Sequence, residues 1–161
     1  PEAQVDRFMF KLIVDYPDLD SERLILRQNT KSVNVDDLDS VVSSQAILNA
    51  QSVIHDIYVD EKVEDYVLNL VFATRNPAEH GLNDLEGIIE YGASPRATIN
   101  LIRGAKARAF MEHRGYITPE DIRYSGADVL RHRIILTYEA EAEELTSEDV
   151  IQRLFEVVEV P

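Results

Sequence analysis

The sequence predicts a mainly α-helical protein, and three observations support this prediction. Apolar residues between positions 63 and 74 recur at the spacing of one helix face. Ser94 and Pro95 combine a favourable N-cap with a residue suited to the first helical position, ahead of a long segment that ends at Gly115. Thr118 and Thr146 are each followed three residues later by an aspartate, which is typical of a helix start.

Composition limits the classes to which the chain can belong. Its 161 residues can form one domain with a real core, or one domain and a fragment of another. No apolar run approaches the roughly 20 residues of a membrane span. The absence of cysteine excludes disulfides and thiolate metal sites and suits the cytoplasmic location that we expect. The histidines show no metal-ligand spacing, and the first residues resemble the interior of a longer protein, so we expect a fragment.

The net charge of −14 is distributed unevenly. Residues 1–91 carry a net charge of −11, residues 92–134 carry +4, and residues 135–161 carry −7. Because nucleic-acid binding requires a basic face, this balance opposes a nucleic-acid partner. The one basic segment suits a local anion such as a nucleotide better than a long polyanion.

The first 42 residues predict one strand and one helix. Residues 8–14 form a short, mostly apolar segment, as in a buried strand whose sheet must lie elsewhere. Pro17 ends this run, and residues 18–20 offer N-caps for a helix that continues to about Arg27. Residues 28–39 are polar and predict a linker.

The next segment predicts two helices followed by a loop. Ser43 or Ser44 can cap a helix with one apolar side, and Asp60 can cap the helix that covers residues 63–74. Pro77 ends that helix, and residues 76–83 are expected to form a loop. Residues 84–91 predict a short helix, although Gly87 lies in its middle. The whole stretch 76–91 either shapes access to the following helix or is merely surface.

The sequence Gly-Ala-Ser-Pro-Arg-Ala at residues 92–97 carries the strongest chemical signal. Its helix is expected to reach about Arg114 and to be capped by Gly115. The free amides and the positive dipole end of the first turn can hold an anion such as phosphate, and Arg96 adds a forked positive charge. Alternatively, Arg96 is a solvated or ion-paired arginine. At about 100° per residue, Arg103, Lys106 and Arg114 share a basic stripe with Arg96.

The last part of the chain predicts two more helices. One starts at Thr118 and runs towards residue 130. Arg131 and Arg133 follow it and are expected to interact with its dipole and with nearby carboxylates. Residues 138–145 predict an acidic loop, and Thr146 starts a last helix that reaches about Val158.

Four motifs, in order and in register, resemble the C-terminal part of MoxR-family AAA+ ATPases. They are Glu-Ala-Gln-Val-Asp-Arg-Phe at residues 2–8, Gly-Ala-Ser-Pro-Arg-Ala at 92–97, Tyr-Ile-Thr-Pro-Glu-Asp at 116–121 and Val-Leu-Arg-His-Arg-Ile at 129–134. The resemblance covers essentially the whole chain. It implies a helical-bundle AAA+ lid domain over residues 43–161, a linker over 30–42, and a short strand and helix over 1–29 that end the αβα core.

The resemblance also implies an ATP site that two subunits of a homo-oligomeric, hexameric ring complete. Arg96 corresponds to the sensor 2 arginine, which, with Ser94 and Pro95, faces the nucleotide phosphates of its own subunit. Arg7 corresponds to the arginine finger, which reaches the γ-phosphate held by a neighbouring subunit. ATP and Mg²⁺ are the expected cofactors of the parent protein, with none bound by this fragment alone. The expected partners are neighbouring subunits and a von Willebrand factor A domain protein or another client.

Several family features do not occur in these 161 residues. They contain no G-x-x-x-x-G-K-[ST] phosphate loop, no strand ending in paired acidic residues for Mg²⁺ and no polar sensor between them. We therefore expect the parent protein, and not this fragment alone, to hydrolyse ATP and to remodel or mature client complexes in a chaperone-like way. The alternative is a non-enzymatic helical adaptor domain that binds a partner protein and in which Arg96 is structural.

Overall fold

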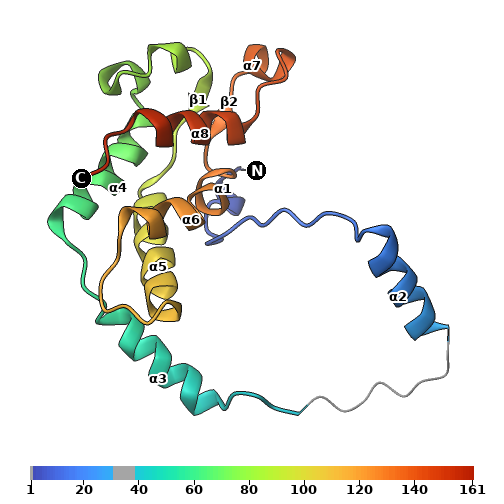
Figure 1. Ribbon diagram of the computed structural model, residues 1–161. Coiled ribbons are helices and arrows are strands. Elements are labelled where there is room, and N and C mark those ends of the chain that lie inside the picture. The colour runs from blue at the N-terminus through green and yellow to red at the C-terminus, as the bar shows by residue number, and fades with distance from the viewer. Residues whose placement is uncertain (1, 31–38) are drawn as a thin grey trace.

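The computed structural model describes residues 2–30 and 39–161, and these are mainly helical, which confirms the predicted fold class (Figure 1). The elements are α1 (Glu2–Val5), α2 (Leu19–Asn29), α3 (Ser44–His55), α4 (Glu61–Ala73), the 3₁₀ turns η1 (Pro77–His80) and η2 (Asn83–Leu85), β1 (Ile89–Tyr91), α5 (Pro95–Met111), α6 (Pro119–Leu130), β2 (Ile135–Leu136), α7 (Tyr138–Ala142) and α8 (Ser147–Val157). In the described ranges, no helix has the length and apolar character needed to cross a membrane. Most of the predicted linker, residues 31–38, lies outside the described residues.

The predicted helix starts are confirmed. The N-caps are Asp18, Ser43, Asp60, Ser94, Thr118 and Thr146. In the capping box before α8, the Thr146 amide donates to the Asp149 carboxylate at 2.9 Å, and the Asp149 amide donates to the Thr146 hydroxyl at 3.2 Å. These short polar side chains satisfy amides that the first turn of a helix leaves without partners.

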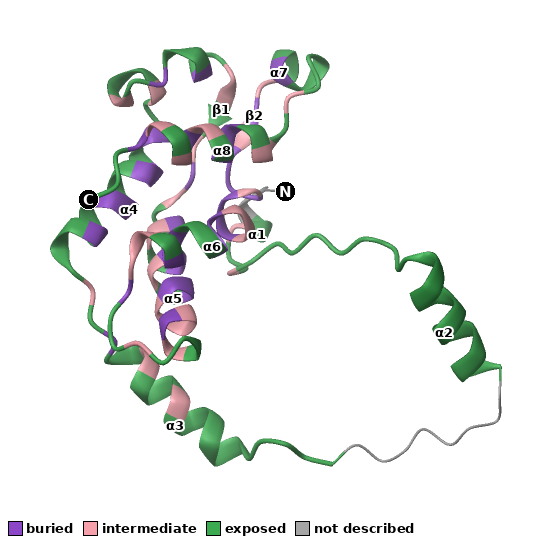
Figure 2. Cartoon of the chain, viewed as in Figure 1, coloured by how far each residue is buried: buried purple, intermediate pink, exposed green. Residues whose placement is uncertain are grey.

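Residues 57–158, which we call the helical body, contain the hydrophobic core. Helix α5 packs against α4 and α6, and α8 packs against α4 and α6. Figure 2 shows that most buried residues lie in this part of the molecule. Its largest fully buried side chains include Tyr66, Leu70, Leu82, Leu101, Ile122, Leu130 and Leu154. A Cβ atom at Gly104 of α5 would lie 2.8 Å from the Ser125 hydroxyl of α6, so small residues let these helices approach closely.

Helices α2 and α3 lie outside that core. Figure 1 shows α2 at a distance from the helical body, and Figure 2 shows it exposed along its length. Neither helix contains a buried residue, and Leu24, Ile25 and Leu26 of α2 are 48–60% exposed. The end of α3 contacts α5. The apolar sides of these helices are therefore formed but largely uncovered among the residues described.

Two predicted elements are wrong. Residues 8–14 do not form a strand, because a strand needs a neighbouring strand to pair with; instead, the Lys11 amide donates to the Asp128 carbonyl of α6 at 2.9 Å. Leu12, Ile13 and Val14 are 65–88% exposed. Residues 84–91 do not form a helix either, since Gly87 adopts a left-handed conformation with φ of 78° and the chain continues into β1.

Two predicted boundaries also differ. Helix α5 ends at Met111, and His113, with φ of 58°, takes the left-handed position predicted for Gly115. This turn is closed by the Arg114 amide, which donates to the Ala109 carbonyl at 2.8 Å. Part of the predicted acidic loop over 138–145 is the short helix α7, because the Thr137 hydroxyl caps it by accepting from the Ala140 amide at 3.3 Å.

The described sheet is a pair of short antiparallel strands, β1 and β2. Ile89 pairs with Leu136 and Tyr91 pairs with Ile135, with an irregularity between the two pairs. Strand β1 leads directly into the turn before α5, and β2 follows the end of α6 by a few residues. The pair therefore places the start of α5 at Pro95 beside the end of α6 at Leu130, although these lie 35 positions apart in the sequence.

Candidate functional site

The turn that begins α5 is fixed on the end of α4. The Ala93 amide donates to the Thr74 hydroxyl at 2.9 Å, and Nε of Arg75 donates to the Ala93 carbonyl at 2.8 Å. A Cβ atom at Gly92 would lie 2.4 Å from the Thr74 carbonyl oxygen, so only glycine fits this approach. The position of the helix start thus depends on packing as well as on its cap.

Ser94 and Pro95 occupy the predicted positions at the start of the helix. Ser94 is the N-cap, and its hydroxyl accepts a hydrogen bond from the Arg96 amide at 3.2 Å. Pro95 takes the first helical position, where its missing N–H costs nothing. The Ser94 hydroxyl also donates towards the Asp6 carboxylate, at 2.9 and 3.0 Å from its two oxygens.

Asp6 lies between two arginines. Nη1 of Arg96 is 2.9 Å from Asp6 Oδ2, and Nε of Arg133 is 3.0 Å from Asp6 Oδ1. The Arg96 side chain is 59% exposed, that of Asp6 is 18% exposed and that of Arg133 is 0% exposed. Burial alone would raise the pKa of Asp6, but hydrogen bonds from Arg96 and Ser94 and the charge of Arg133 lower it. One carboxylate thus faces two guanidinium groups, which leaves an excess of positive charge at the start of α5.

The two ion pairs of Asp6 have different energetic weights. Breaking a buried pair costs on the order of 3–5 kcal/mol, since the remaining charge stays desolvated, whereas an exposed pair contributes about 0–1 kcal/mol. Arg133 is fully buried, and burial lowers its pKa against the opposing effect of Asp6. The Asp6–Arg133 pair is therefore the lasting contact. The Asp6–Arg96 pair lies between these two cases, since Asp6 is 18% and Arg96 59% exposed, and Arg96 is the partner that an incoming anion can reach from solvent.

Arg133 also holds the backbone around Arg7. Its Nη2 donates to the Asp6 carbonyl at 2.7 Å and to the Phe8 carbonyl at 2.5 Å, the carbonyls on either side of Arg7. Its Nη1 is 3.3 Å from the Met9 carbonyl. Sequence reasoning assigned Arg133 to the helix dipole and to carboxylates, but most of its acceptors are backbone carbonyls far away in the sequence.

Neighbouring residues attach the rest of residues 6–11, which we call the N-terminal strap. His132 lies with Nε2 3.1 Å from the Phe8 carbonyl. Because burial lowers the pKa of His132, the ring is neutral near pH 7, and its Nε2–H donates to that carbonyl while Nδ1 lacks a hydrogen-bond partner in the described chain. Arg131 donates to the Lys11 carbonyl and pairs with Asp128 and, at 2.6 Å, with Glu148. The expected carboxylate pairing of Arg131 is confirmed.

The Arg7 side chain takes no part in these contacts among the described residues. It is exposed, and its guanidinium lies 5.3 Å from the centre of the Phe8 ring. Its side chain makes no hydrogen bond or ion pair with the residues that the structure describes. The structure thus brings Ser94, Pro95 and Arg96 to the strap that carries Arg7, but it does not place the Arg7 side chain in their site.

A small cavity of about 310 Å³ adjoins Asp6 and the start of α5. Gly92, Ser94, His132 and Arg133 are among the residues that line it. Its walls thus come from the strap, strands β1 and β2, the turn before α5 and the segment that follows α6. Arg96 does not line this cavity, but its side chain is 59% exposed at the same start of α5.

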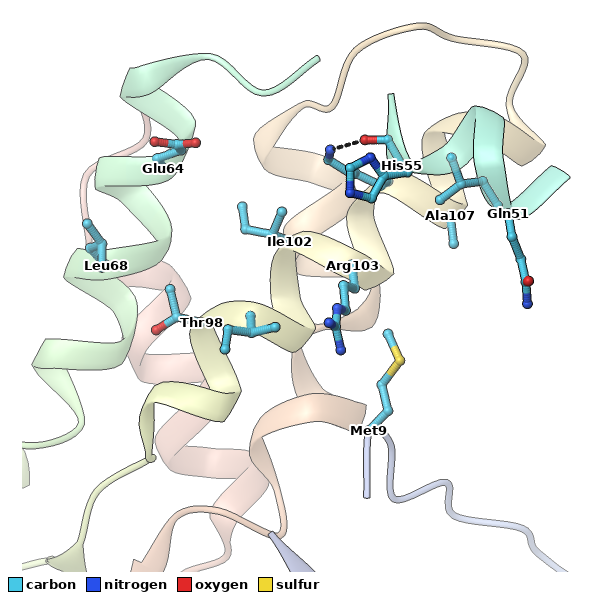
Figure 3. A pocket seen from close by; sticks show the side chains of 12 residues that line it. Met9, Gln51, His55, Glu64, Leu68, Thr98, Ile102, Arg103 and Ala107 are labelled. Carbon is cyan, nitrogen blue, oxygen red and sulfur yellow. Dashed lines mark hydrogen bonds between the residues drawn. The ribbon is translucent and has the colours of Figure 1, made fainter. Parts of the chain in front are cut away.

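The basic stripe predicted along α5 does not act as one surface. Arg114 binds the buried carboxylate of Asp121 through two bonds of 2.5 and 2.8 Å. Lys106 donates to the His55 carbonyl at 2.7 Å. Arg103 has no ion pair in the described part of the chain. It lines a second hollow of about 990 Å³ between α3, α4, α5 and Met9, whose walls also include apolar side chains such as Ile102 (Figure 3).

Sequence reasoning missed Asp6 and the main role of Arg133. Both belong to motifs that it had singled out, at residues 2–8 and 129–134. Their roles depend on contacts between residues 127 positions apart, and no local pattern encodes those. A signal was nevertheless present, because an isolated aspartate next to the candidate finger Arg7 is a ready partner for a buried arginine.

Comparison with known proteins identifies relatives over the whole chain. Residues 85–154 match the AAA lid domain family. The chain is 39% identical to Chaperone MoxR1 of Mycobacterium tuberculosis and 32% identical to the uncharacterized protein YeaC of Bacillus subtilis; each match covers 100% of this chain and 42% or 48% of the relative. A crystal structure from Cytophaga hutchinsonii, provisionally named an ATPase, superposes with a TM-score of 0.95 at 43% identity, over 100% of this chain and 49% of that one. The chain thus spans a little under half the length of these relatives.

Proposed function

Since the chain belongs to the MoxR family of AAA+ proteins and contains their lid domain, we propose that it is the part of an AAA+ ATPase that closes over ATP. In the whole protein, this closure couples ATP hydrolysis to chaperone-like remodelling or maturation of client protein complexes. The observation that carries the proposal is the exposed guanidinium of Arg96 at the start of α5, whose ion-pair partner among the described residues is Asp6. The adaptor alternative is not favoured, because the relatives match over the whole chain.

Arg96 is proposed to act as the sensor 2 arginine. A guanidinium beside a helix N-terminus presents both a forked donor and free backbone amides, which together suit the oxygens of a phosphate. Ser94 and Pro95 fix where that turn begins. When bound, ATP with Mg²⁺ supplies the phosphoryl group, and the role of Arg96 is to orient it and to stabilise its charge.

Arg7 is proposed to act as the arginine finger. Its exposed side chain extends from a backbone that Arg133 fixes on both sides, which suits a group that reaches into a neighbouring subunit. Such an arginine contributes on the order of 10³–10⁵ in rate. This role requires a ring of subunits, and we propose a hexamer.

The domain division remains a proposal. Residues 1–29 are assigned to the end of the AAA+ core, 30–42 to a linker and 43–161 to the lid. Within the first segment, α2 has no buried residue, whereas residues 6–11 bond to the helical body. We further propose a cytoplasmic protein whose partner is a von Willebrand factor A domain protein or another client, and in which this segment alone does not hydrolyse ATP.

Replacing Arg96 in the whole protein tests the sensor assignment. We expect Arg96→Ala to lower ATP turnover by about 10²-fold, since it removes a donor that stabilises transition-state charge. Arg103→Ala is the matched control, because Arg103 is an exposed arginine two turns further along the same helix. Steady-state hydrolysis measures both variants, and near-normal turnover in Arg96→Ala would contradict the assignment.

Mixed rings test the assignment of Arg7. Arg7→Ala subunits still bind ATP, and subunits with an inactivated phosphate loop still offer Arg7 to a neighbour. Mixing these two inactive proteins should restore part of the activity. Without restoration in rings shown to contain both subunits, the finger assignment fails.

A further inference from the structure

The contacts of the N-terminal strap connect the two arginines that the proposed function places at different nucleotide sites. Arg133 donates to the carbonyls of Asp6 and Phe8, which bracket Arg7. Asp6 in turn accepts from Arg133 and from Arg96. One aspartate side chain therefore lies between the candidate sensor and the backbone of the candidate finger.

These contacts attach the strap to the helical body at several points. Arg133 lies between α6 and β2, and its side chain is fully buried, so its guanidinium has little freedom to move. The Lys11 amide bonds the Asp128 carbonyl at 2.9 Å, which fixes the far end of the strap on α6. Arg7 projects into solvent from a backbone that is held by the helical body.

The two partners of Asp6 differ in how readily they leave. Arg96 is 59% exposed and can exchange the carboxylate for a phosphate oxygen, whereas Arg133 is buried with Asp6 as its ion-pair partner. After such an exchange, Asp6 still bonds Arg133. The backbone of Arg7 therefore stays attached to the body that carries Arg96, whatever Arg96 binds.

We propose that Arg133 and Asp6 are positioning residues for Arg7, which fix the backbone of the arginine finger to the lid. The lid that senses a subunit's own nucleotide through Arg96 thereby also sets where Arg7 is presented to the next subunit. This inference rests on the proposed roles of Arg7 and Arg96.

The test uses the whole protein in mixed rings. Subunits with a working phosphate loop are mixed with an excess of subunits whose phosphate loop is inactivated. The second type binds no nucleotide, so its contribution to hydrolysis is the Arg7 that it gives to a neighbour. Placing Arg133→Lys in this second type keeps a cation beside Asp6 but removes the fork that holds the two carbonyls.

We expect Arg133→Lys in the second type to lower kcat per working site at least about tenfold, with KM unchanged, and Arg7→Ala in the same type to lower it further. A loss confined to the variant subunit's own site cannot produce this result, because that site is already inactive. Arg153→Lys is the control, since Arg153 pairs with Asp84 at 2.7 Å on an exposed surface away from the strap.

The outcomes separate this inference from the proposed function. If Arg7→Ala in the second type has no effect, the finger role itself fails. If Arg7→Ala lowers kcat and Arg133→Lys does not, the finger role stands and the positioning role is overturned. Thermal unfolding and sizing of the rings check that the variants fold and assemble. If Arg133→Lys subunits do not fold or assemble, the second type of subunit carries the isosteric Asp6→Asn substitution instead. An unchanged kcat in those rings again overturns the inference.

Discussion

Helices α2 and α4 are alike in sequence terms but differ in what covers them. Each starts at an aspartate N-cap and has an apolar side, and their lengths are 11 and 13 residues. Helix α4 buries six residues in the helical body, whereas α2 buries none among the residues described. The comparison teaches that spacing determines where a helix forms and which side is apolar, while its packing partner depends on the rest of the fold.

The largest expected effect lies in the packed region. Leu101 of α5 is fully buried, so Leu101→Ala should lower the free energy of unfolding of this chain by about 2–5 kcal/mol, through lost burial and the cavity left behind. Urea denaturation followed by circular dichroism measures this change. A loss below about 1 kcal/mol would mean that the helical body is less well packed than the buried residues of α4 and α5 indicate.

A smaller loss is expected at the junction between α4 and α5. Gly92→Ala would place a methyl group against the Thr74 carbonyl and should cost about 1–3 kcal/mol, since the backbone must shift to accommodate it. Gly115→Ala is the control, because a Cβ atom there meets nothing within 4 Å. Equal stability of the two variants in the same denaturation experiment would refute the close approach.

The acid stability of the helical body should depend on Asp121. Burial raises the pKa of Asp121, but hydrogen bonds from Arg114 and Thr118 outweigh it and lower that pKa below the ordinary value of 3.8. Since the folded state has the lower pKa, this contribution is present above about pH 4 and is lost as pH falls through the folded value. We expect a stabilising contribution of about 1–2 kcal/mol.

Asp121→Asn should remove that part of the pH dependence. The free energy of unfolding is measured between pH 6 and pH 2.5, with Asp65→Asn as the control because Asp65 is an exposed carboxylate of α4. An Asp121→Asn curve with the same acid slope as the unsubstituted chain would assign the slope to other carboxylates.

The smallest effect is expected in α2. Leu24 is 56% exposed, so Leu24→Ala should change the free energy of unfolding by less than about 0.5 kcal/mol. The same leucine-to-alanine change is thus compared in the two regions. A loss at Leu24 as large as that at Leu101 would show that α2 packs against the chain in solution.

Local chemistry made much of the fold predictable. Asp60, Ser94 and Thr146 cap helices where the sequence indicates, because each side chain satisfies amides within three residues of itself. The strand predicted over 8–14 failed for the opposite reason, since a strand exists only with a neighbour that the local sequence does not encode.

The candidate site divides in the same way. Ser94, Pro95 and Arg96 were found from one short motif, as their relation is set by the first turn of a single helix. The link from Asp6 to Arg133 joins residues 127 positions apart and was visible only in the structure. The sensor and finger roles of Arg96 and Arg7 remain predictions that the kinetic experiments address.

Because β1 is paired with β2, the segment before β1 can change in length, whereas the segment between β1 and Ser94 cannot. Residues added at the exposed Glu86 and Gly87, before β1, would enlarge a surface turn while the paired strands kept the start of α5 beside Arg133. One residue added between β1 and Ser94 would shift the start of α5 relative to Asp6. Natural and engineered insertions should therefore be tolerated before β1 and excluded between β1 and Ser94.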